Sequence, residues 1–88
     1  MSLLSTLAEQ LAKECNLSED RYIAVVRDGV EMYFVEDQGR ARKAQRCMKI
    51  RLTTFELFSF ERDRTARAGF VEQARHNWLA LRRGEVMP

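Results

Sequence analysis

Two runs of β-branched and aromatic residues on either side of Asp28-Gly29 constrain this sequence more than any other feature. The first run spans residues 22–27 and the second spans residues 30–35. Side chains of these types favour β-strands. Asp-Gly favours a two-residue type I′ turn, because both turn positions need a positive φ angle. We therefore predict a β-hairpin over residues 22–35.

The predicted turn also fixes a register for the hairpin. It pairs Ile23 with Phe34 and Val25 with Met32 on one face, and it places Tyr22, Ala24, Tyr33 and Val35 on the other. Since both faces are apolar, we expect each to be covered at least in part, by helices or by a second subunit. Any apolar strip left exposed would mark a protein interface. The candidate interface residues are Tyr22, Tyr33 and Val35.

Helices are predicted at both ends of the chain. Leucines at positions 3, 4, 7 and 11 recur at helical spacing, and Asn16 can end this first helix in a left-handed turn. Alanine and aromatic residues step by four from Ala66 to Trp78, which predicts a second long helix from Asp63 or Thr65 to just before Gly84. Residues 85–88 are expected to fray.

The middle of the chain leaves one alternative open. Residues 47–52 alternate between apolar and basic, which predicts a third strand with one wet face, although residues 40–48 also suit a basic helix. Thr53 and Glu56 have capping-box spacing, so residues 53–60 form either a helix or a continuation of the strand through Phe58. We expect five aromatic residues to fill the core: Phe55, Phe58, Phe60, Phe70 and Trp78.

Together these elements predict a single α+β domain over residues 1–88. The order is αβββα, with an antiparallel three-stranded meander packed against two long helices. A chain of this size buries only roughly 60–65% of the surface that its unfolded form exposes. A homodimer is a hypothesis that would enlarge this small core.

Charge is distributed unevenly along the sequence. Residues 1–39 carry three basic and eight acidic side chains, a net charge of −5, whereas residues 40–88 carry twelve basic and five acidic ones, a net charge of +7. Six cations fall within twelve residues and have no acid between them: Arg40, Arg42, Lys43, Arg46, Lys49 and Arg51. A loop and strand that carry them would form one positive patch suited to phosphates. The alternative is that the two halves neutralise each other.

Several classes of chemistry lack their usual sequence signals. His76 is the single histidine, and it matches no zinc-binding spacing with Cys15 and Cys47. The glycines are isolated, so no phosphate-cradling loop is expected. We predict no catalytic residues, no metal and no cofactor. With no signal peptide and no apolar run long enough to span a membrane, we expect two free thiols and a cytoplasmic location.

The sequence therefore predicts a non-enzymatic regulatory or accessory protein that docks on a macromolecule. Nucleic acid is slightly favoured as the partner, through the six-cation patch. The alternative is a protein–protein interaction module, an adaptor or inhibitor, that uses an apolar hairpin or helix face. A thiol-dependent enzyme is a third hypothesis, and it would require an unusually reactive cysteine.

Overall fold

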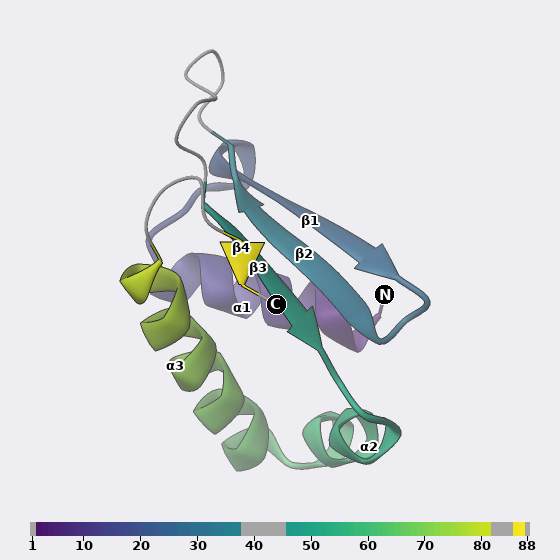
Figure 1. The fold of residues 1–88 in the computed structure, drawn as a ribbon. Coiled ribbons are helices and arrows are strands. Elements are labelled where there is room, and N and C mark those ends of the chain that lie inside the picture. Colours follow the sequence, from purple (N-terminus) through teal and green to yellow (C-terminus); the bar gives the residue numbers. More distant parts are fainter. Residues whose placement is uncertain (1, 38–45, 82–85, 88) are drawn as a thin grey trace.

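The computed structural model describes residues 2–37, 46–81 and 86–87, with side chains described for the first two ranges. Figure 1 shows the arrangement of the elements. In chain order they are α1 (Leu3–Glu14), the short 3-10 helix η1 (Glu19–Arg21), β1 (Tyr22–Arg27), β2 (Glu31–Glu36), β3 (Cys47–Arg51), α2 (Thr54–Arg62), α3 (Arg64–Ala80) and β4 (Val86–Met87). The predicted α+β class and the αβββα order are confirmed. The predicted strand over residues 47–52 is confirmed to within one residue.

The sheet has the strand order β1-β2-β3-β4. The first three strands form the predicted antiparallel meander, and β4 pairs parallel to β3 through Cys47 with Val86 and Met48 with Met87. The expectation that residues 85–88 fray is wrong for the two residues of β4. A strand of two residues is too short to produce a periodic pattern in the sequence.

Local hydrogen bonds define both ends of α1. The Ser2 side chain accepts from the Ser5 backbone N–H at 3.2 Å. At the other end Asn16 has φ 57°, and the Leu17 N–H donates to the Ala12 carbonyl at 2.8 Å. This is the left-handed termination that the sequence predicted at Asn16.

A capping box decides the alternative left open for residues 53–60. Glu56 N–H donates to Thr53 Oγ1 at 3.1 Å, and Thr53 N–H donates to Glu56 Oε1 at 2.9 Å, so α2 begins here and β3 does not continue. Asp63 then caps α3 by accepting from the Thr65 N–H at 2.9 Å. The helix α3 ends at Ala80, earlier than the predicted stop at Gly84, which lies outside the described residues.

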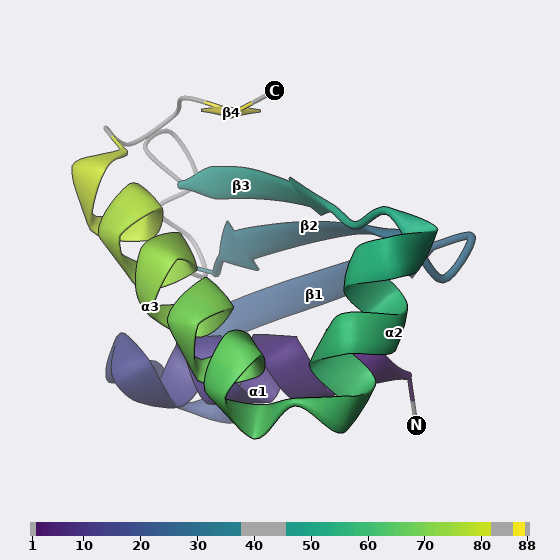
Figure 2. The same cartoon turned by 90° about the horizontal axis from the view of Figure 1, so that it is seen from below.

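The three helices pack on one face of the sheet (Figure 2). Trp78 of α3 is 1% exposed and meets Phe34 of β2 edge-on, with ring centroids 4.9 Å apart. Tyr22 stacks on the same Phe34 ring at 5.2 Å. The other buried apolar residues come from α1, β2, β3, the residue after β3, and α3: Leu4, Leu7, Ala8, Leu11, Ala12, Met32, Met48, Ile50, Leu52, Val71 and Ala74.

The hairpin register differs from the prediction by one residue. The turn itself is as expected, because Asp28 and Gly29 have φ angles of 55° and 71° and the Val30 N–H donates to the Arg27 carbonyl at 3.2 Å. However, Arg27 pairs with Glu31. Val30 is thus the extra residue of a β-bulge. Its carbonyl accepts from the Leu52 N–H at 2.8 Å instead, which ties it to the β3 side of the sheet.

This shift redistributes the residues of β1 between the two faces of the sheet. The predicted pairs Ile23 with Phe34 and Val25 with Met32 are wrong; Ile23 pairs with Val35 and Val25 pairs with Tyr33. Side chains of Tyr22, Ala24 and Val26 pack toward the helices. The bulge is therefore the feature that decides which side chains β1 exposes.

Candidate functional site

The side of the sheet opposite the helices, which we call the open face, carries three cross-strand rows. They are Ile23–Val35–Cys47, Val25–Tyr33–Lys49 and Arg27–Glu31–Arg51. Ile23 and Val25 lie next to each other on the same face of β1, and their side chains are 49% and 53% exposed. The first row is apolar apart from its thiol, the second is mostly apolar and the third is charged.

Basic groups dominate the charges of the open face. Lys49 Nζ lies 3.4 Å from Glu31 Oε1 and 5.9 Å from the Tyr33 ring centroid. Arg27 and Arg51 are exposed at the two ends of the same charged row. In the three rows of described residues, three cations therefore stand beside one carboxylate. The open face combines an aliphatic and aromatic strip with a positive border.

The structure divides the six predicted phosphate-binding residues. Lys49 and Arg51 lie on the open face, as the alternation of β3 predicted. Arg46 lies on the covered side: its guanidinium stands 5.4 Å from the Trp78 ring centroid, and its Nε is 3.8 Å from Glu36 Oε2. The other three residues, Arg40, Arg42 and Lys43, lie outside the described residues. The expectation of a single surface shared by all six cations is wrong for Arg46.

The predicted interface residues are also divided between the two faces. Tyr33 and Val35 lie on the open face, whereas Tyr22 packs its ring on Phe34 on the helix side. Burial raises the pKa of the Tyr22 hydroxyl, and the carboxylates of Glu9 and Glu19 add to this shift. The predicted grouping of the two tyrosines on one face is wrong, because the Val30 bulge moves β1 by one residue relative to β2.

Two exposed aromatic residues on α2 were expected to lie in the core. Phe55 is 80% exposed and Phe58 is 55% exposed, and the Arg62 guanidinium lies 5.7 Å from the Phe58 ring centroid. Leu57 and Phe60 of the same helix pack against the core. Four apolar side chains within six residues exceed what one face of a helix can bury, and this density was the signal for exposed aromatics.

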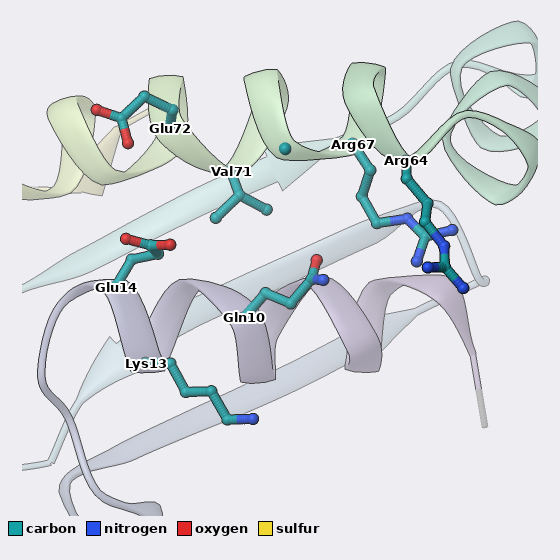
Figure 3. A pocket seen from close by; sticks show the side chains of 8 residues that line it. Gln10, Lys13, Glu14, Arg64, Arg67, Val71 and Glu72 are labelled. Carbon is teal, nitrogen blue, oxygen red and sulfur yellow. The ribbon is translucent and has the colours of Figure 1, made fainter.

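A pocket of about 530 Å³ lies between α1 and α3. Figure 3 shows Arg64 and Arg67 at one end of it, and Glu14 and Glu72 toward the other. The Arg67 guanidinium is engaged, because its Nε donates to the Phe60 carbonyl at 2.8 Å and its Nη2 to the Glu61 carbonyl at 3.2 Å. These bonds satisfy carbonyls at the end of α2. Arg67 thus fixes α2 against α3, which accounts for its place in the pocket.

Cys15, Cys47 and His76 are the described side chains best suited to nucleophilic or metal-binding chemistry. Burial raises the pKa of the Cys15 and Cys47 thiols, so each carries less thiolate than a free cysteine. His76 is exposed and its Nε2 lies 3.2 Å from Glu72 Oε1. Among the described residues, no group of three or more metal-ligating side chains is close enough to hold an ion.

No protein-family model, curated protein or solved structure gave a significant match to this chain. None of the helices in residues 2–37 and 46–81 combines the length and the apolar character that crossing a bilayer requires. The surface chemistry described above is therefore the basis for a functional proposal.

Proposed function

We propose that this chain is a non-enzymatic protein-interaction module that docks on a partner protein through the open face of its sheet. The observation that carries the proposal is the exposure of Ile23 and Val25, each about half open to solvent, next to Tyr33 and Val35. Burying a half-exposed aliphatic strip against a partner stabilises the complex by roughly 25 cal/mol per Å² of apolar area removed from water.

The charges of the open face specify the chemistry of the partner. Arg27, Lys49 and Arg51 outnumber Glu31, so a matching surface is apolar with an acidic border. A second copy of this chain fits less well. It would bring the same excess of cations to the interface, and the additional positive charges would lack carboxylates to pair with. The proposed partner is a different protein.

Nucleic acid is the second candidate partner. In its favour, Lys49, Arg51 and Arg27 lie on one face, and Arg40, Arg42 and Lys43 precede β3 in the sequence. Two observations weaken it. Arg46 is engaged with Trp78 and Glu36. In the described strands, Tyr33 is the single aromatic ring on the open face, and it stands among aliphatic side chains that offer bases no stacking surface.

The test compares two variants of the full chain in affinity capture from a lysate. Val25→Asp places a charge in the apolar strip. Phe55→Asp also introduces an aspartate at an exposed apolar position, but on α2, where the Phe55 side chain is 80% exposed. We expect Val25→Asp to lose the captured protein and Phe55→Asp to retain it. Arg51→Glu should weaken capture of an acid-bordered partner, and this loss should diminish in high salt because exposed charges are screened.

Three outcomes would contradict the proposal. Capture that resists Val25→Asp would place the interface elsewhere on the molecule. Capture of nuclease-sensitive material, with affinity that falls steeply with salt, would support nucleic acid instead. Sedimentation of a dimer that Val25→Asp dissociates would show that a second copy covers the open face.

A further inference from the structure

The outer edge of β3 is only partly used within the described residues. On one side β3 pairs along its whole length with β2, whereas on the other side β4 pairs only with Cys47 and Met48. The stretch Lys49–Arg51 extends beyond β4 and has no strand partner on that side among the described residues. Edges of this kind accept an additional strand from another chain.

Two hydrogen bonds show which backbone groups face this edge. The Arg46 carbonyl accepts from the Glu36 N–H at 3.0 Å, and the Leu52 N–H donates to the Val30 carbonyl at 2.8 Å. Even-numbered positions of β3 therefore direct their backbone groups toward β2. Because these groups alternate along a strand, Lys49 and Arg51 direct theirs toward the outer edge. At Arg51 both groups lie beyond the end of β4.

A groove of about 300 Å³ lies beside this edge, between β3 and α3. Its apolar lining includes Met48, Ile50, Phe70 and Ala74. At its α3 rim, Gln73 Nε2 donates to Asn77 Oδ1 at 3.2 Å. Side chains on the helix side of an added strand would lie next to Ile50, where an apolar residue fits. Those on the other side would lie next to Lys49 and Arg51, where an acidic residue fits.

We propose that the Lys49–Arg51 edge and the adjoining groove bind an extended segment of another protein, in which acidic and apolar residues alternate, as an additional strand. The pairing of β4 shows that this edge accepts a strand, since Val86 and Met87 already pair with its first half. Pairing between two copies of this chain through the edge would set Lys49 and Arg51 against each other, so the occupant is a different chain. This site borders the open face and shares the side chains of Lys49 and Arg51 with it. It adds the backbone edge and the groove, so Val25→Asp, which disrupts the apolar strip of the open face, should leave the binding of such a segment unchanged.

The experiment titrates the full chain with a blocked Glu-Val-Glu-Val-Glu peptide and follows the backbone amides by NMR. We expect saturable binding, with the largest shift changes and slowed amide exchange at Arg51. A Lys-Val-Lys-Val-Lys peptide should bind several-fold more weakly. Arg51→Glu should lower the affinity for the acidic peptide by roughly 3- to 10-fold. Arg27→Glu, at the far end of the same charged row, should change this affinity little.

A backbone variant tests the strand pairing, and Arg51→Ala, which removes the same charge but keeps the N–H, is its control. Arg51→Pro removes the outward N–H and should lower the affinity for the acidic peptide even in high salt. Circular dichroism checks that the variant is folded. Arg51→Glu keeps the backbone and serves where the proline variant does not fold. The proposal is wrong if no binding occurs at millimolar peptide, if both peptides bind equally, or if the shift changes lie on α2 or β1. Equal loss with Arg27→Glu would also overturn it.

Discussion

The two faces of the sheet are built from alternate residues of the same three strands and differ in how far they are covered. On the helix side Met32 and Phe34 have no exposed surface, whereas on the open face Ile23 and Val25 are about half exposed. Side chains of similar polarity therefore occupy both faces. The helices cover the first set, whereas no element of the described residues covers Ile23 and Val25. An apolar face of a strand therefore does not by itself show where the core lies, because this depends on which face the helices cover.

The largest effect should come from the covered face. Phe34→Ala removes a ring that meets both Trp78 and Tyr22, and it should lower the free energy of unfolding by about 3–5 kcal/mol in a urea titration. Ile23→Ala is the control on the open face and should cost less than about 1 kcal/mol, because its side chain is already 49% exposed. Similar costs for the two variants would mean that the open face is covered in solution.

A smaller effect should distinguish the two kinds of arginine in the predicted basic patch. Arg46→Ala removes an ion pair with Glu36, whose side chain is 8% exposed, and a contact with Trp78. It should cost roughly 1–3 kcal/mol, since a nearly buried carboxylate loses its cation. The exposed Arg51→Ala should cost less than about 0.5 kcal/mol. Urea titrations of both variants give the comparison, and equal costs would refute the separate roles.

The turn that sets the faces of the hairpin can be tested with two glycines. Gly29→Ala forces an alanine to adopt φ 71° and should cost about 1–2 kcal/mol, although nothing lies within 4 Å of the added carbon. The control Gly69→Ala adds a carbon within α3, also into open space, and should stabilise by about 0.5–1 kcal/mol. Thermal unfolding should show a lower melting temperature for Gly29→Ala and a higher one for Gly69→Ala than for the unchanged protein. Destabilisation by both would contradict the strain argument.

The smallest effect concerns the thiols, one at the end of α1 and one on the open face. Because burial raises the pKa of Cys15 and Cys47, each should react with iodoacetamide at pH 8 a few-fold more slowly than free cysteine. Unfolding in urea should remove the difference. Mass spectrometry of each labelled residue measures the rates. A thiol that reacts much faster than free cysteine would support the thiol-enzyme hypothesis.

The sequence predicted those elements whose cause is local. Helical spacing located α1 and α3, capping chemistry was present at Thr53 and Asp63, and Asp28-Gly29 specified the turn. The register failed because the Val30 bulge depends on a hydrogen bond with Leu52, a residue far along the chain. Strand β4 was missed because two residues carry no periodic signal.

The candidate site could be predicted only in part. Alternation along β3 correctly placed Lys49 and Arg51 on one face, since that pattern has a period of two. The same alternation places Arg46 on the side of Met48 and Ile50, but its contact with Trp78, 32 residues away, is not encoded in any local pattern. The exposure of Phe55 likewise depends on which side of α2 meets α1 and α3. These failures share one cause, because each position is decided by tertiary packing.

The Val30 bulge has a consequence for length variants of this protein. Deleting Val30 would join Gly29 directly to Glu31, so Asp28 and Gly29 would connect the observed pair Arg27 and Glu31 without a bulge. Such a shortened chain would keep Ile23 and Val25 outward, but the Leu52 N–H would lose its acceptor. A one-residue insertion in the loop would add length that the tight turn does not accommodate. At this hairpin, a one-residue deletion should therefore be tolerated better than a one-residue insertion.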